Sequence, residues 1–115
     1  MRIESVGIFG ASGFVGTRLA NQLAAQGVAL RVFTRSRNTA RHLWQLPNCE
    51  VIETDIFDAE GLSKYVAGCD AVINLVGIIN EKGDDGTGFR RVHTELTRTI
   101  IKVCFNTGVQ RYIHM

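Results

Sequence analysis

Cysteine is scarce in this chain, and the few cysteines form no pattern. Cys49, Cys69 and Cys104 are odd in number, lie far apart and show no metal-ligand spacing. The sequence therefore offers neither a disulfide framework nor a cysteine-based metal site. We expect these residues to be buried or half-buried thiols in a reducing compartment.

The chain also lacks a strong excess of charge and a long hydrophobic run. Its formal net charge is only +2 over 115 residues, with basic and acidic side chains dispersed. This balance argues against nucleic acid or an anionic membrane as a partner. No apolar run approaches the ~18 residues of a membrane-spanning helix. The composition, 45% hydrophobic and 21% charged, predicts one globular domain over residues 1–115.

Strand-like and helix-like segments alternate along the whole chain. β-Branched and aromatic residues predict strands, and apolar residues at helical spacing predict helices. The predicted strands cover residues 3–9, 28–34, 50–54, 70–77 and a segment from 111. The predicted helices cover residues 14–26, 38–46, 58–67 with Asp58 as the N-cap, and 89–106, with Gly27 and Gly108 as C-terminal glycines.

This order predicts a Rossmann-type α/β domain, a doubly wound parallel sheet with strand order 3-2-1-4-5 and helices on both faces. The polar segment 80–88 predicts a loop, and its adjacent carboxylates in "GDDG" are too few for a metal site. The predicted fifth strand starts only a few residues before the sequence stops at Met115, so we expect a chain that is truncated there. An uncovered edge of this strand predicts self-association.

Three glycines stand where the first strand turns into the first helix. In "GASGFVG", Gly10 permits a tight turn, Gly13 lets the backbone approach a pyrophosphate, and Gly16 lets the helix pack closely on the strand. The helix N-terminus offers free N–H groups to phosphates, and the Ser12 hydroxyl adds a donor. A tight turn without a ligand is the alternative, but the strand–turn–helix context favours dinucleotide binding.

The residues after the second strand bear on the choice of cofactor. An acidic residue there would hold the ribose 2′-hydroxyl of NAD, whereas this chain has Arg35 and Arg37. A guanidinium can bind a 2′-phosphate, which predicts NADP(H), with NAD(H) possible and Arg35 the stronger candidate. Asp55, after the third strand, either accepts a bond from adenine or forms a turn.

At this point the sequence resembles a known family. "GASGFVG", "DIFD", "GCDAVINLVG" and "TGVQRYIHM" are similar to segments of extended and atypical short-chain dehydrogenase/reductases, the epimerase/dehydratase-like proteins. "NLVGII" and "FRRVHTELTRTIIKVCFNTGVQRYIHM" resemble the branch with the dehydrogenase-like accessory subunit of respiratory complex I and its bacterial relatives. The resemblance covers the N-terminal part of the family's usual length.

The resemblance implies a set of cofactor contacts. Those at the pyrophosphate are Gly10, Ser12, Gly13, Phe14 and Val15, with Gly16 in the same loop. Arg35 takes the 2′-phosphate, and Asp55 and Ile56 lie at the adenine. Leu75, Val76 and Gly77 run past the two riboses.

Two departures leave the catalytic site unassigned. Active members carry a Tyr-x-x-x-Lys pair, and none of Lys64, Lys82 and Lys102 has a tyrosine four residues earlier. Many members have Asn where His93 stands; His93 is either a functional imidazole or a locally packed helix residue. His42 and His114 show no partner pattern.

The resemblance implies an NADP(H)-binding domain with a structural, assembly or redox-sensing role, with protein partners of a respiratory-complex type. It would lie in the bacterial cytoplasm or on the matrix side of an organelle, soluble or peripheral. The alternative is the cofactor domain of an NADPH-dependent oxidoreductase or nucleotide-sugar epimerase whose catalytic residues lie beyond residue 115. A third possibility is a vestigial loop in an interaction domain.

Overall fold

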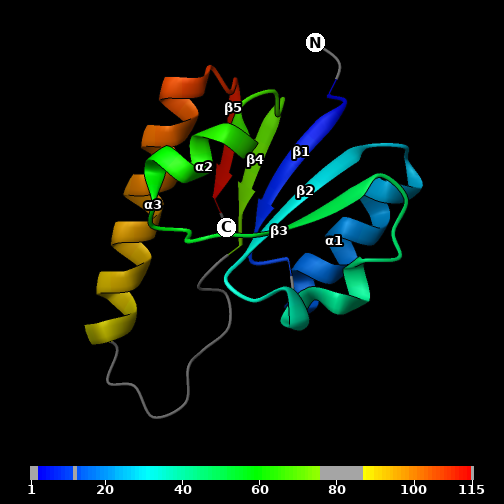
Figure 1. The fold of residues 1–115 in the computed structure, drawn as a ribbon, viewed down its shortest axis with the longest axis horizontal. Helices are drawn as coiled ribbons and strands as arrows, with labels where there is room; N and C mark the ends of the chain where they lie inside the picture. The colour runs from blue at the N-terminus through cyan, green and yellow to red at the C-terminus, as the bar shows by residue number, and fades with distance from the viewer. Residues whose placement is uncertain (1–2, 12, 76–86, 115) are drawn as a thin grey trace.

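The computed structural model describes residues 3–11, 13–75 and 87–114 (Figure 1). Strands and helices alternate in it as the periodicity predicts. The strands are β1 (Ser5–Phe9), β2 (Ala29–Thr34), β3 (Cys49–Glu53), β4 (Ala71–Asn74) and β5 (Arg111–His114). The helices are α1 (Phe14–Ala25), the 3₁₀ segment η1 (Arg37–Leu43), α2 (Ala59–Val66) and α3 (Thr87–Thr107).

The five strands form one parallel sheet in the order β3-β2-β1-β4-β5, which confirms the predicted topology. In the register, Phe9 pairs with Phe33 on one side and with Asn74 on the other. The carboxyl ends of β1, β2 and β4 therefore meet at one edge of the sheet (Figure 1). In a doubly wound sheet, ligands bind at this edge where the strand order reverses, here between β1 and β4.

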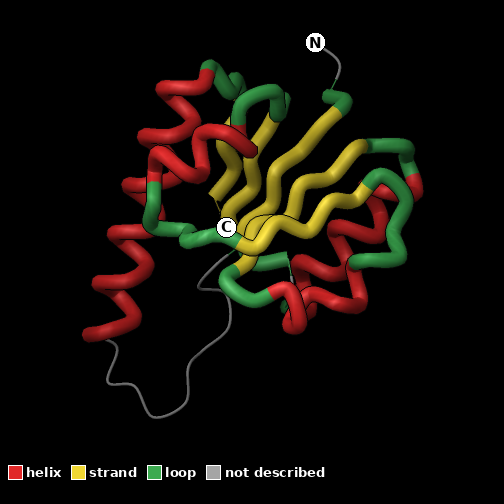
Figure 2. Tube along the Cα trace, viewed as in Figure 1, coloured by secondary structure: helices red, strands yellow, loops and turns green. Residues whose placement is uncertain are grey.

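Helices cover both faces of the sheet (Figure 2). α1 and η1 pack on one face over a core that includes Ile8, Leu30 and Leu43. α2 and α3 pack on the other face over Phe9, Leu62 and further apolar side chains. The predicted stripe of α3 is buried at Leu96, Ile100, Val103 and Cys104, while the side chain of Val92 lies outside the described part.

One predicted helix has a different form. Residues 38–46 were expected to form an ordinary helix, but the segment is a 3₁₀ helix over Arg37–Leu43 with a non-helical break at Ala40. Ala40 and Leu43 are both fully buried against α1 and the sheet. Because 3₁₀ geometry has three residues per turn, this i, i+3 pair lies on one side of the segment.

The predicted helix ends agree with the structure. Gly27 and Gly108 take positive φ values of 83° and 77° after α1 and α3, as glycines that end helices do. Asp58 is the N-cap of α2, although its side chain makes no capping hydrogen bond. No described helix is long and apolar enough to cross a membrane.

Candidate functional site

The glycine turn joins β1 to α1 at the carboxyl edge of the sheet. Gly10 has φ +86°, a left-handed conformation that a side chain disfavours. A Cβ on Gly16 would lie 2.4 Å from Ala11 Cα and 2.6 Å from the Gly10 carbonyl oxygen. Both positions therefore require glycine, and the turn folds back tightly against the first turn of the helix.

The N-terminus of α1 is open to an anion. Its N-cap is Gly13, which has no side chain to cap the helix, and the first turn carries no acidic residue. The first intrahelical bond runs from Thr17 N–H to the Gly13 carbonyl at 2.9 Å. The N–H groups before Thr17 therefore lack helical partners and lie at the positive end of the helix dipole. Free N–H groups at a helix N-terminus are suited to phosphates, and the pyrophosphate contact of this turn stays a prediction.

Two of the predicted contacts in this loop cannot be placed. Ser12 lies outside the described residues, as does the side chain of Phe14. Val15 is placed, in the first turn of α1, with its side chain 39% exposed.

The end of β2 presents Arg35 to solvent. Its side chain is exposed, and the described part of the chain gives its guanidinium no ion-pair partner. The neighbouring turn is fixed by two bonds of the Thr34 hydroxyl, which donates to the Ser36 carbonyl and accepts the Ser36 N–H. Arg35 thus stands on an ordered turn at the carboxyl edge.

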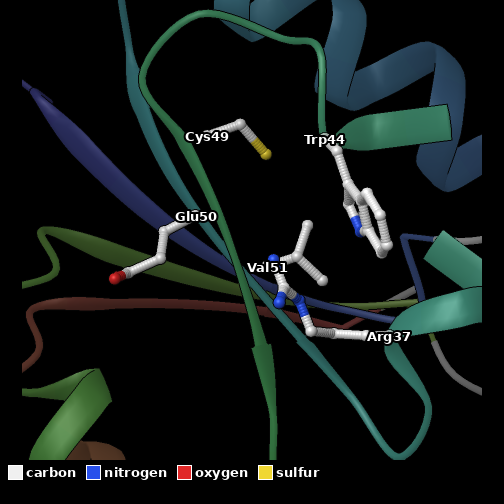
Figure 3. A pocket seen from close by; sticks show the side chains of 5 residues that line it. All are labelled: Arg37, Trp44, Cys49, Glu50 and Val51. Carbon is white, nitrogen blue, oxygen red and sulfur yellow. The ribbon is translucent and has the colours of Figure 1, made fainter. Parts of the chain in front are cut away.

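Arg37 has a different environment. Its guanidinium lies over the indole of Trp44, 4.9 Å from the ring centroid. With Trp44 it lines a pocket along β3 together with Cys49, Glu50 and Val51, of which Glu50 points to the opposite side of the strand from Trp44 (Figure 3). Its backbone N–H donates to Glu53 Oε1 at 2.9 Å. The Arg37 guanidinium thus packs on an aromatic ring, and the binding of a 2′-phosphate by Arg35 stays a prediction.

The residues after β3 form a turn. Asp55 Oδ1 accepts the Phe57 N–H at 2.9 Å, and the Asp55 carbonyl accepts the Asp58 N–H. The turn interpretation of Asp55 is thus confirmed, and its contact with adenine stays a prediction. Ile56 is 8% exposed and packs with the α2 and α3 core.

A polar cluster lies at the ends of β4 and β5, where Asn74 is buried, Tyr112 is half-buried and His114 is exposed. The side chain of Asn74 is fully buried, and its Nδ2 donates to Tyr112 Oη at 3.1 Å and lies 3.3 Å from His114 Nδ1. Tyr112 Oη is 3.2 Å from the same imidazole nitrogen. Burial raises the pKa of the Tyr112 phenol, and the hydrogen bond from Asn74 works against that rise.

Sequence reasoning missed this cluster, because His42 and His114 show no partner pattern in the sequence. His114 pairs with Tyr112 and Asn74, and His42 Nε2 lies 2.8 Å from Thr17 Oγ1. One signal was available: Asn74 is a polar residue inside an otherwise apolar strand, where burial demands partners.

The remaining predicted contacts are only partly placed. Leu75 is buried, and its N–H donates to the Phe9 carbonyl at 2.8 Å, which holds the end of β4 beside the glycine turn. Val76, Gly77 and the "GDDG" segment lie outside the described residues, as does the side chain of His93. The described residues contain no group of three or more potential metal ligands.

The three cysteines are free thiols, with Cys49 half-buried and Cys69 and Cys104 buried, as predicted. Burial raises the pKa of all three thiols. For Cys104, burial and then the neighbouring Cys69 raise the pKa to about 11. These groups are thus protonated at neutral pH and suit packing better than chemistry.

Comparison with known proteins identifies the family of proteins that has this glycine turn. The model of a family described as NAD(P)H-binding matches residues 10–115. The chain belongs to the NAD(P)H-binding family. It is an NAD(P)-binding domain of the superfamily that includes epimerases and short-chain dehydrogenases, which confirms the resemblance seen in the sequence.

Two curated relatives of this NAD(P)H-binding domain differ in role. A ketoreductase from Stigmatella aurantiaca, named for a farnesyl dihydroquinoline oxide, is 26% identical over 108 residues, 94% of this chain and 32% of the relative. The mitochondrial NADH-ubiquinone oxidoreductase 40 kDa subunit of Neurospora crassa is 30% identical over 111 residues, 94% of this chain and 29% of the subunit. The chain thus spans about a third of the length of these relatives.

Solved structures share the fold. The Bordetella bronchiseptica enzyme WbmG in complex with NAD matches with a TM-score of 0.81 and 19% identity, over 98% of this chain and 37% of that one. The family match and the glycine cradle together assign a nicotinamide dinucleotide to this domain, without distinguishing NADP from NAD.

Proposed function

We propose that this domain binds NADP(H) in preference to NAD(H). The observation that carries the proposal is Arg35, an exposed cation on an ordered turn at the end of β2, where NAD sites place an acid. A guanidinium there would form charge-assisted bonds with a 2′-phosphate. The alternative cation, Arg37, packs its guanidinium on Trp44, and its backbone N–H donates to Glu53.

The other contacts follow the geometry of the carboxyl edge. Gly10, Ser12, Gly13, Phe14, Val15 and Gly16 would hold the pyrophosphate through their turn and the helix N-terminus. Asp55 and Ile56 would lie at the adenine. Leu75, Val76 and Gly77 would run past the riboses, since the end of β4 is held beside the turn by the bond from Leu75 to Phe9. When bound, the dinucleotide would supply a hydride donor or acceptor.

A calorimetric titration with NADPH and NADH tests the proposal. We expect NADPH to bind at least tenfold more tightly than NADH, and Arg35→Ala to remove most of this difference with little effect on NADH. Arg98→Ala, which removes an equal charge from the exposed face of α3, is the matched control and should change neither affinity. Tighter binding of NADH would contradict the proposal and would direct attention to Glu53 as a ribose partner.

For the whole protein we propose a structural, assembly or redox-sensing role among protein partners of a respiratory complex. The similarity to the 40 kDa subunit of NADH-ubiquinone oxidoreductase supports this role. That relative is mitochondrial, so the matrix side of an organelle or the bacterial cytoplasm is the proposed place. Copurification of the full-length protein with a respiratory complex, lost in a variant that binds no cofactor, would support assembly.

An active oxidoreductase or epimerase is the second candidate. The similarity to a ketoreductase favours it, as does the phenol–imidazole cluster of Tyr112 and His114 at the carboxyl edge. An enzyme of this kind would oxidise NADPH with a carbonyl substrate, or interconvert nucleotide sugars, when supplied as the full-length protein. We expect no turnover from these 115 residues alone, because they contain no Tyr-x-x-x-Lys pair.

A further inference from the structure

A hydrogen-bonded chain links the glycine turn to η1. The Thr17 hydroxyl, in the first turns of α1, lies 3.1 Å from the Ala11 carbonyl oxygen and 2.8 Å from His42 Nε2. Ala11 belongs to the glycine turn, and His42 stands near the end of η1. The glycine turn, α1 and η1 therefore meet at one hydroxyl group.

The direction of these bonds follows from counting protons. A threonine hydroxyl has one proton to donate and can accept further bonds. Because the Ala11 carbonyl can only accept, the Thr17 proton goes to Ala11. His42 Nε2 then donates to Thr17 Oγ1, which requires a proton on Nε2.

This link, together with the fully buried side chain of Leu43, holds the far end of the segment that follows Arg35. The near end of η1 is fixed by the bond from Arg37 N–H to Glu53, and its middle by the fully buried side chain of Ala40. Because the His42 side chain is exposed, its bond to Thr17 orients η1 but buries no apolar surface. Arg35 therefore stands on a turn whose following segment is held at both ends.

We propose that the Thr17–His42 link positions η1 relative to the glycine turn, so that Arg35 reaches the 2′-phosphate of a cofactor whose pyrophosphate lies on that turn. Thr17 and His42 are positioning residues here, and neither needs to touch the cofactor. The inference rests on the proposed function, because it concerns the selectivity of that same site.

The test is a double-mutant cycle read by calorimetry with NADPH and NADH. We expect His42→Ala to weaken NADPH binding about fivefold to tenfold and NADH binding less than twofold. Thr17→Val also removes the bond to Ala11 in the glycine turn, so it should weaken NADPH binding at least as much. The double variant should bind NADPH no more weakly than the weaker-binding single variant, because both substitutions break the same hydrogen bond. His42→Gln, which can place a donor near Nε2, and Thr17→Ser, which keeps the hydroxyl, should restore NADPH binding to within about threefold. Thr99→Val, whose hydroxyl bonds to the Glu95 carbonyl in α3, is the control for losing such a bond elsewhere.

The outcomes separate the two proposals. Failure of the unaltered protein to bind either cofactor would overturn the proposed function and this inference with it. Normal binding, combined with equal losses for NADPH and NADH in His42→Ala, would overturn the positioning role alone. A ¹⁵N spectrum of the free protein tests the link without any cofactor: a neutral His42 ring protonated on Nδ1 instead of Nε2 would also overturn it.

Discussion

At the scale of single residues, Gly16 is the most constrained position of the cofactor loop. Replacement of a helical glycine by alanine normally stabilises a helix by up to about 1 kcal/mol. Here the added methyl group would lie 2.4 Å from Ala11 Cα and 2.6 Å from the Gly10 carbonyl oxygen, and neither backbone atom can move away freely. The close approach of α1 to the turn therefore outweighs helix propensity.

We predict that Gly16→Ala lowers the free energy of unfolding by about 2 kcal/mol or more and weakens dinucleotide binding. Urea denaturation measures the first effect and calorimetry the second. Gly27→Ala is the comparison: that site has positive φ but no neighbour within 4 Å, so its cost should be about 1 kcal/mol. A Gly16→Ala variant as stable as the unaltered protein would contradict the predicted backbone clash.

Asp70 gives the stability a dependence on pH. Its carboxylate Oδ2 accepts the N–H groups of Glu4 at 2.7 Å and Ser5 at 3.1 Å, which ties the start of β1 to β4. These two bonds lower the pKa of the carboxyl group below its usual 3.8. Because the folded-state pKa lies below the unfolded one, the stabilisation is present above pH 3.8 and is lost as pH falls through the folded-state pKa.

Asp70→Asn should therefore be less stable than the unaltered protein at pH 7, and the two should converge in strong acid. Chemical denaturation at a series of pH values measures the difference. Asp58→Asn serves as the control, because Asp58 is exposed and makes no capping bond. A difference that stays constant down to pH 2 would show that the charge of Asp70 is not the cause.

At the scale of elements, Arg31 connects the sheet to α2. From the middle of β2, its Nη1 donates to the carbonyl oxygens of Tyr65 and, at 3.0 Å, Ala67. These carbonyls lie at the C-terminal end of α2, where the helix dipole is negative and carbonyls lack helical partners. The half-buried Arg31 side chain on β2 thus caps the C-terminus of α2.

We predict that Arg31→Met, which keeps the aliphatic stem, costs about 1 kcal/mol of stability. The protection of the last turn of α2 from hydrogen exchange should fall more than that of α1. Arg98→Met on α3 removes the same charge from an exposed site and should leave both quantities unchanged. Equal loss of protection in α1 and α2 would indicate global destabilisation instead of a lost cap.

At the scale of the whole molecule, the two edges of the sheet differ. The β3 edge carries the exposed carboxylates of Glu50 and Glu53, which disfavour pairing with another strand. The β5 edge has no further strand among the described residues and exposes 46% of Ile113. The β5 edge is therefore the place where a second copy would pair.

We predict that these 115 residues associate as the concentration rises, as sedimentation velocity would show. Ile113→Lys should reduce the association, because it places a charge on the edge. Ile101→Lys on α3, at a side chain of similar exposure, should not. Monomeric behaviour at all concentrations would contradict association through β5.

The sequence by itself determined the parallel sheet, its strand order and the glycine turn. The elements and the turn depend on local properties, namely the period of apolar residues along each element and the conformational freedom of glycine at the first strand–helix junction. The strand order was predicted from the alternation of strands and helices and from right-handed crossovers. The same properties placed Arg35 at the end of a strand. Interactions between residues that are close in the sequence can be predicted from the sequence alone.

Only the tertiary structure decided which polar side chains meet. Thr17 and His42 lie 25 positions apart, and Asn74 and Tyr112 lie 38 apart, so no local pattern pairs them. The pairing of Arg37 with Trp44 and the 3₁₀ form of η1 likewise depend on how that segment packs against α1 and the sheet. Periodicity fixes which face of an element is buried, but the positions of its ends, and hence the partners found there, follow from packing of the whole chain.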